Sequence, residues 1–280
     1  MRFQLVSTGN VNRFMDAAKA LEPRLSDPEI MGMGLVYGKP GLGKTMALEA
    51  YHARSRKTKR VKTIHVRAMA HWTEASMLKA ILQALGHEPR QYRKDLMFDQ
   101  IQEALTGDPA IILIDEIDAI AGSRTMMAIL KDIHDVTGSA ILMIGEDRVD
   151  GLLKRFESFY NRMNRGALAH LSNHDESDIA AVIAQRCEVD VDPSVANAIH
   201  QETGGRSMRS VIDRIRDIEA FARTNGVKRL LLADYRKAVK DDRGPRFLQE
   251  AGSPTPSGKN TQTGAGSLAG QRPLAEAANA

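Results

Sequence analysis

The sequence predicts an α/β protein in which a five-stranded parallel sheet with intervening helices is followed by a smaller helical region. Three observations support this fold class. Five short apolar segments alternate with segments of helical periodicity as far as Ser172, which favours one sheet with right-handed crossovers. A glycine-rich turn with phosphate-binding spacing joins the first apolar segment to a helix. After Ser172 the sequence shows helical patterns and no convincing strand.

The elements are expected in this order. Apolar residues at helical spacing, ended by Pro23, indicate a helix before the first strand. Strands are expected at 34–37, 61–68, 110–114, 139–146 and 166–172. The helices between them are expected to begin near Gly43, at Thr73 as a cap, and at 95–105 and 125–138. Four further helices are expected within 175–187, 192–205, 207–225 and 232–239.

These patterns divide the chain into four predicted parts. Residues 1–30 form a lead-in with the first helix, 31–172 the α/β domain, and 173–245 the all-helical domain. Residues 246–280 are rich in Gly, Ser, Thr, Pro and Ala and contain almost no large apolar residue. Such a segment cannot bury enough surface to fold by itself, so we expect a disordered tail that is either inert or a partner-binding segment.

The turn "YGKPGLGKT" has the spacing of a loop that binds a nucleotide triphosphate. Residues without side chains let backbone N–H groups approach the phosphates, and the helix that follows directs its positive dipole end at them. Lys44 is expected to pair with the β and γ phosphates, and the Thr45 hydroxyl to coordinate Mg²⁺. The residues expected to bind ATP are Gly38, Lys39, Pro40, Gly41, Leu42, Gly43, Lys44, Thr45 and Met46.

The segment "AIILIDEIDAI" places two acids at the end of a buried strand. Ligands of open α/β sheets bind at that edge. We expect Asp115 to hold Mg²⁺ through water in the nucleotide-binding site, and Glu116 to orient and deprotonate the attacking water. The pair therefore predicts an ATP hydrolase.

Composition sets limits on the class of protein. Hydrophobic residues make up 42% of the chain and charged residues 26%, which is ordinary for a soluble domain. No apolar run reaches the roughly 18 residues of a membrane span, and the first residues lack the apolar centre of a signal peptide. We therefore expect a cytoplasmic protein without a membrane partner. The single cysteine, Cys187, provides neither a disulfide framework nor a zinc site.

The cations are distributed unevenly. Between Glu49 and Glu74 there is no acid. The same interval contains Arg54, Arg56, Lys57, Lys59, Arg60, Lys62 and Arg67. Helix ends collect some cations, but this excess favours contact with a polyanion such as the phosphates of DNA.

The motifs "GKPGLGKT" and "IILIDE", a fourth apolar strand, and a helical region with an arginine near a glycine turn resemble the AAA+ ATPases. The resemblance covers roughly residues 30–245. Within that superfamily, "HVRAMAHWTEASMLKAILQALG" and "ETGGRSMRSVIDRI" are similar to the transposition ATPases of the Mu B type, which act in bacterial hosts.

This resemblance implies that ATP lies between neighbouring subunits and that an arginine of one subunit reaches the γ-phosphate of the next. Arg162 is the first candidate for that arginine, and Arg165 is the second. Arg209 corresponds to the family's lid arginine that contacts the nucleotide, with Arg206 as the alternative. The sequence departs from the family at Glu146, where a neutral polar side chain is usual, so the role of this position stays open.

The resemblance also implies ATP-dependent assembly of the chain on double-stranded DNA, as a homo-oligomer or helical filament. Only about thirty residues precede the first strand, so we expect the ATPase body itself to contact DNA. The expected contacts are Lys57, Lys59, Arg60, Arg67 and Arg124, with the loop from Arg67 to Thr73. The partner implied by the family is a transposase.

The leading hypothesis is a sequence-nonspecific, DNA-binding AAA+ ATPase that regulates transposition by selecting the target and activating the transposase. The alternatives are a helicase loader or replication initiator, a secretion-linked ATPase, a P-loop kinase acting on a small molecule, and a DNA-coating protein with an inactive ATP site. Turnover of ATP would exclude the last of these, and DNA-independent activity of a monomer would favour the kinase.

Overall fold

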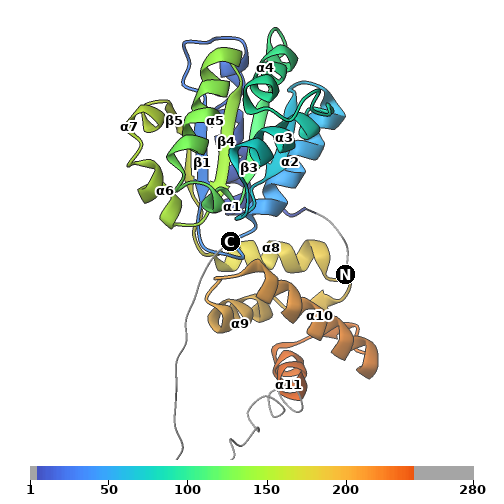
Figure 1. Ribbon diagram of the computed structural model, residues 1–280. Helices are drawn as coiled ribbons and strands as arrows, with labels where there is room; N and C mark the ends of the chain where they lie inside the picture. Colours follow the sequence, from blue (N-terminus) through green and yellow to red (C-terminus); the bar gives the residue numbers. More distant parts are fainter. Residues whose placement is uncertain (1–4, 243–280) are drawn as a thin grey trace, which may run out of the picture. The chain divides into compact units, whose positions relative to one another are not determined.

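The computed structural model describes residues 5–242 (Figure 1), and for residues 240–242 the backbone alone. Five parallel strands form one sheet in the order β2-β3-β4-β1-β5. Their bounds are β1 Met33–Tyr37, β2 Thr63–Arg67, β3 Ile111–Asp115, β4 Ala140–Gly145 and β5 Met163–His170. The predicted α/β fold with five parallel strands is confirmed. The tail predicted at 246–280 lies outside the described residues.

Seven helices accompany the sheet within the described residues, and one of them begins after the capping residue that the sequence suggested, Thr73. They are α1 Gly9–Lys19, α2 Lys44–Thr58, α3 Glu74–Ala84, α4 Lys94–Leu105, α5 Arg124–Thr137, α6 Arg148–Leu153 and α7 Glu157–Tyr160. The Thr73 side chain accepts a hydrogen bond from the Ser76 N–H, as predicted. Pro23 falls inside a short 3-10 helix, Glu22–Leu25, four residues after α1 has ended. A second 3-10 helix, Ile117–Ala119, follows β3.

Both faces of the sheet are covered, which explains why the central strands are apolar throughout. Every residue of β3 is buried. On one face, α3, α4 and α5 pack their buried side chains against Ile112 and Ile141. On the other face, Phe14 of α1 and Leu48 of α2 pack against Leu113 and Leu142. Helices on both faces leave the two ends of the strands for loops, and the loops at the carboxyl ends build the site described below.

The fifth strand begins at Met163, three residues earlier than the sequence predicted. Its pairing with β1 is irregular, because Met33 pairs with Met163 whereas Leu35 pairs with Leu168. The strand lies at the edge of the sheet, and its residues before Ala167 are half-buried or exposed. An apolar signal therefore appears only in its second half.

The remaining helices pack around a core of their own. They are α8 Glu176–Arg186, α9 Ser194–Thr203, α10 Met208–Asn225 and α11 Leu232–Asp242. Ile179, Ile199, Ile215 and Tyr235 are fully buried there. Two strands of two residues each, β6 Asp190–Val191 and β7 Arg229–Leu230, pair in parallel between these helices. The sequence did not predict them, since two residues are too few to show periodicity.

The passage from sheet to helices is fixed by hydrogen bonds from α1. The Asn10 side chain donates to the Ser172 carbonyl (2.8 Å) and accepts from the Ser172 N–H (3.3 Å). The Gly9 N–H donates to Asp178 Oδ1 of α8 (2.7 Å). The His174 N–H donates to the Gly205 carbonyl (2.8 Å), and a Cβ at Gly205 would lie 1.8 Å from the His174 oxygen. The predicted boundary between the α/β domain and the helical domain, at residues 172 and 173, stays a prediction.

Candidate nucleotide-binding site

The loop between β1 and α2 has the backbone of a phosphate-binding turn. Gly41 and Gly43 have φ values of 84° and 89°, a region that favours glycine. A Cβ at Gly41 would also lie 2.5 Å from Ser207 Oγ, whereas a Cβ at Gly43 would meet nothing within 4 Å. Backbone conformation alone thus explains glycine at 43. The Gly38 N–H donates to the Gly145 carbonyl (3.3 Å), which joins the loop to the end of β4.

Lys44 is held by this loop. Its Nζ donates to the carbonyls of Gly38 (2.5 Å) and Lys39 (2.9 Å). Burial lowers the pKa of Lys44, and the nearby carboxylates of Glu146, Asp118 and Asp115 oppose that shift. The ammonium is therefore positioned beside the N–H groups that open α2, where an anion would be neutralised.

The two acids after β3 take different positions. Asp115 is 3% exposed, and its two oxygens accept from Thr45 Oγ1 and from the Glu116 N–H, each at 2.9 Å. Glu116 has φ of 55°, which is rare for a residue other than glycine and marks stored backbone strain. Its side chain is half exposed and lies 3.4 Å from Arg67 Nη2. Asp115 is thus fixed, while Glu116 reaches toward solvent.

The oxygens of Thr45 and Asp115 fit a magnesium ion. Mg²⁺ prefers oxygen ligands and is usually bound by one or two protein groups together with water and substrate phosphates. In residues 5–242 no group of three or more His, Cys, Asp or Glu side chains could hold a metal by itself. The pair therefore matches a metal that binds together with a phosphate ligand.

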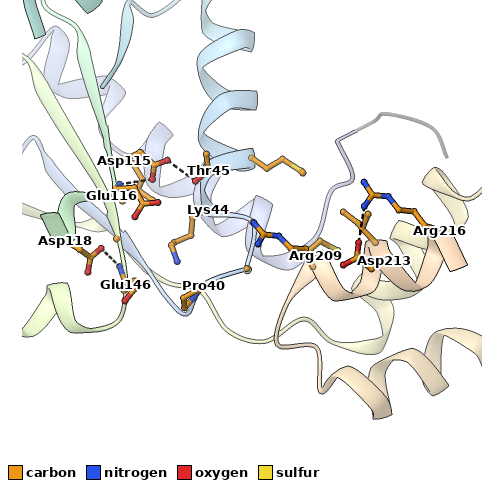
Figure 2. A pocket seen from close by; sticks show the side chains of 17 residues that line it. Pro40, Lys44, Thr45, Asp115, Glu116, Asp118, Glu146, Arg209, Asp213 and Arg216 are labelled. Carbon is orange, nitrogen blue, oxygen red and sulfur yellow. Dashed lines mark hydrogen bonds and ion pairs between the residues drawn. The ribbon is translucent and has the colours of Figure 1, made fainter. Parts of the chain in front are cut away.

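A cavity of about 540 Å³ opens over this loop, a size within the range of small-molecule sites. Figure 2 shows its side chains, which come from the loop before α2 and the first turn of α2, from the ends of β3 and β4 with the residues that follow them, and from α10. The Met208 N–H, at the start of α10, donates to the Gly41 carbonyl (2.8 Å). Arg209 points toward the loop that carries Lys44 (Figure 2). Arg206, the alternative for Arg209, is not among the residues that line this cavity.

The cavity also contains residues that sequence reasoning missed. Asp118 is 8% exposed in its side chain, accepts from the Glu146 N–H (2.8 Å), and pairs with Arg148 Nε at 3.1 Å. It thereby fixes the backbone of Glu146, which lines the cavity. Asp213 and Arg216 of α10 form a pair at 3.0 Å and line the other side. Two sequence signals could have indicated these residues. Asp118 is an acid two positions after the "DE" pair, and Asp213 and Arg216 are opposite charges three residues apart in the helix that follows the Gly-Gly turn.

The two candidate arginines lie at the opposite end of the sheet from Lys44. Met33 begins β1, pairs with Met163, and donates its N–H to the Arg162 carbonyl. Arg162 makes a two-point ion pair with Asp135 of α5, at 2.6 and 2.7 Å, and its third nitrogen donates to the Ser158 carbonyl. Arg165 is exposed and forms no ion pair with any other described residue. The guanidinium of Arg165 is therefore the accessible one.

The predicted DNA contacts separate into two groups. Lys57, Lys59 and Arg60 are exposed at the end of α2 and just after it, near the strand starts. Arg67 ends β2, in register with Asp115, and Arg124 begins α5, so these two lie at the carboxyl edge of the sheet, where the cavity opens. Lys62 pairs with Asp108 at 2.7 Å. The interval without acids in the sequence is thus partly neutralised in space by acids from other segments.

Part of the chain is similar to a known protein family. Residues 31–153 match the family model described as an AAA domain. The match covers the loop before Lys44, both acids after β3, and the strand that precedes Glu146, so the cavity is lined by the matched segment and by the α10 helix beyond it. Across 5–242, no helix has the length and apolar character that would let it cross a lipid bilayer.

Individual proteins resemble the chain over more of its length. Proteasome-activating nucleotidase 1 of Haloferax volcanii is 26% identical over 224 residues, which are 77% of this chain and 48% of that protein. The chain thus spans about half the length of this relative. The structure of the Aeropyrum pernix ORC2 protein aligns with a TM-score of 0.65 at 16% identity, over 90% of this chain and 74% of that one. The Aeropyrum pernix ORC1 protein in complex with DNA aligns with a TM-score of 0.58 at 18% identity, over 88% and 68%. At these identities the solved structures show the fold alone, which is the P-loop AAA+ fold.

Proposed function

We propose that the chain is a Mg²⁺-dependent ATPase that assembles with further copies of itself on double-stranded DNA, and that it regulates transposition. The observation that carries the ATPase part is the joint placement of Lys44, Thr45, Asp115 and Glu116 at one cavity of about 540 Å³. A site for binding alone would not need a strained, half-exposed carboxylate beside a fixed one. Glu116 is that additional group.

The residues divide the chemistry as follows. The loop N–H groups and Lys44 bind the phosphates, and Thr45 and Asp115 hold Mg²⁺, which neutralises phosphate charge when bound. Glu116 accepts the proton of the attacking water, since its side chain reaches beyond the buried Asp115. Arg209 approaches from α10 and contacts the nucleotide phosphates. Closing α10 over the loop excludes bulk water from the phosphates.

The site needs an arginine from a second copy to stabilise the charge that develops on the γ-phosphate. Arg162 and Arg165 lie at the start of β5, so neither reaches the cavity of its own chain. In a head-to-tail assembly the strand starts of one copy face the cavity of the next. Arg165 takes this role in our proposal, because the guanidinium of Arg162 is already engaged by Asp135 and Ser158. ATP then favours assembly because only the assembled site is complete.

The exposed cations support a DNA partner, as does the likeness to an ORC1 protein whose structure was determined with DNA. Replacing Lys59 and Arg60 with Ala should weaken duplex binding and reduce its salt dependence by about two phosphate contacts. Replacing Arg67 and Arg124 tests the second group in the same way. Fluorescence anisotropy over a salt series measures both slopes, and ATP binding serves as the control. A flat salt response of the unchanged protein contradicts a phosphate-contact mode.

The transposition role rests on the similarity of two segments to the Mu B-type ATPases, and the partner is then a transposase. A replication initiator or helicase loader is the second candidate, favoured by the likeness of the fold to ORC proteins. Strand-transfer assays with a transposase, compared with helicase-loading assays, distinguish the two. Electron microscopy with duplex DNA, with and without a non-hydrolysable ATP analogue, tests the ATP-dependent assembly common to both. Unchanged particles in the two conditions would refute it.

A further inference from the structure

Glu146 lies in the nucleotide cavity on the strand next to the one that carries the proposed proton acceptor. It is the first residue after β4, as Glu116 is the first residue after β3, and these two strands are neighbours in the sheet. Both side chains line the cavity (Figure 2). In the mechanism proposed above, Glu116 faces the water that attacks the γ-phosphate. The neighbouring position therefore brings Glu146 to the same end of the triphosphate.

The backbone at Glu146 is fixed by two hydrogen bonds. The Glu146 N–H donates to Asp118 Oδ2 (2.8 Å), and the carbonyl of the preceding residue, Gly145, accepts from the Gly38 N–H (3.3 Å). A Cβ at Gly145 would lie 2.8 Å from Asp118 Oδ2, so the chain passes very close to this acid. The Glu146 side chain is half-buried and forms no hydrogen bond or ion pair with another side chain of residues 5–242.

The charge of Glu146 acts on Lys44. The Lys44 Nζ donates to the carbonyl of Gly38, and Gly38 is joined in turn to Gly145, so the ammonium and Glu146 belong to one connected loop contact. Burial lowers the pKa of Lys44, and among the acids that oppose this shift Glu146 has the largest effect. A phosphate that pairs with Lys44 therefore competes with Glu146 for the same positive charge.

The cavity carries more negative than positive charge. Five acids and three cations of the described chain line it: Asp115, Glu116, Asp118, Glu146 and Asp213, against Lys44, Arg209 and Arg216. Relative to ADP, the γ-phosphate of ATP adds a further negative charge. Like charges that share a site repel each other unless a cation neutralises them. A further cation is needed, and a neighbouring copy can supply it.

We propose that Glu146 weakens the binding of ATP relative to ADP in the isolated chain, and that the arginine of the neighbouring copy cancels this effect on assembly. The guanidinium neutralises both the γ-phosphate and Glu146, which Lys44 alone does not. ATP binding and assembly then favour each other, because each removes part of the cost of the other. This inference rests on the nucleotide binding and the assembly proposed above.

The isolated chain tests the first half of the proposal. Displacement of a fluorescent ADP from dilute full-length protein, with Mg²⁺ and without DNA, gives the affinities for ADP and for a non-hydrolysable ATP analogue. Glu146→Gln keeps the size of the side chain and removes its charge. We expect this change to shift the ratio of affinities toward the ATP analogue at least about fivefold, the effect of one unit charge about 4 Å away even at the dielectric constant of water.

Two further variants make this result specific. Glu146→Ala removes the carboxylate in a different way and should shift the ratio in the same direction. Asp147→Asn is the matched control, because Asp147 is the next residue in the chain and its side chain does not line the cavity. It should keep the ratio of the unchanged protein. Melting curves check that all three variants are folded.

The assembled protein tests the second half. The same titrations are repeated with duplex DNA at protein concentrations that give assembly. Assembly should shift the ratio toward the ATP analogue in both proteins, and the shift should be at least about fivefold smaller in Glu146→Gln, since this variant has no charge to neutralise. Equal shifts in the two proteins would show that the neighbour does not neutralise Glu146.

The outcomes separate this inference from the proposed function. If the unchanged protein binds neither nucleotide, the nucleotide-binding function fails. If both nucleotides bind but neither Glu146 variant changes the ratio, the role of Glu146 is refuted and nucleotide binding stands. If Glu146→Gln instead weakens the ATP analogue and raises the Mg²⁺ concentration needed for binding, Glu146 is a metal ligand and the proposed repulsion is wrong.

Discussion

Arg165→Ala is expected to stop ATP hydrolysis by the assembled protein while leaving ATP binding intact. The first and last Cα atoms of a five-residue strand are about 13 Å apart at 3.3 Å per residue, so Arg165 lies too far from Lys44 of its own chain to touch the same phosphate. An arginine supplied by a neighbour contributes about 10³ to 10⁵ in turnover. We therefore expect a loss of at least about a thousandfold.

Mixing experiments reveal whether the arginine acts between copies. Lys44→Ala lacks a working phosphate loop and retains Arg165, whereas Arg165→Ala retains the loop. In an equal mixture of these two inactive variants, about one interface in four joins an intact loop to an intact arginine when neighbours assemble at random. The mixture should therefore recover about a quarter of the activity of the unchanged protein.

The assay is phosphate release at protein concentrations that give assembly on DNA. Arg162→Ala is the matched control: it should melt at a lower temperature, because the two-point pair with Asp135 is lost, and should retain hydrolysis below that temperature. An inactive mixture, or full turnover by Arg165→Ala alone, would refute the reasoning. Loss of hydrolysis by Arg162→Ala alone, with recovery when it is mixed with Lys44→Ala, would assign the role to Arg162.

Three further substitutions have defined outcomes. Glu116→Gln should bind ATP normally and hydrolyse it about 10² to 10⁴ times more slowly; phosphate release at the normal rate would contradict its role as proton acceptor. Thr45→Val keeps the shape of the side chain and removes the hydroxyl, so the Mg²⁺ concentration for half-maximal turnover should rise; an unchanged requirement would exclude Thr45 as a ligand. Gly205→Ala should unfold at a much lower temperature than Gly226→Ala. Both glycines have positive φ, which costs an alanine about 1–2 kcal/mol, but only at Gly205 would the Cβ strike a carbonyl, that of His174. Equal melting of the two variants would disprove the contact.

The sheet and the phosphate-binding face of the site were accessible to sequence reasoning, because their signals are local. Buried parallel strands are apolar on both faces, and the loop with Lys44 needs its glycines within a few residues. The acids after β3 follow directly from the strand. These features need no knowledge of which distant segments meet.

The remaining features depend on contacts between distant segments. Asp118 reaches the Glu146 N–H across 28 residues, and Arg162 reaches Asp135 across 27. Neither pairing has a local pattern. The same limit applies to the basic interval, where Lys62 is neutralised by Asp108 from the end of another crossover. A sequence shows how many charges a segment carries, and only the fold shows which of them remain unpaired.

The double hydrogen bond between Asn10 and Ser172 has a mechanical consequence. The Asn10 side chain bonds both backbone groups of Ser172. The segment that connects β5 to α8 therefore cannot rotate unless α1 moves with it or these two hydrogen bonds break. Rotation of helices α8 to α11 about this connection is therefore limited to small angles. The backbone N–H of Ser172 should accordingly exchange with deuterium as slowly as the N–H groups of the sheet interior. In an ordinary flexible linker it would exchange quickly.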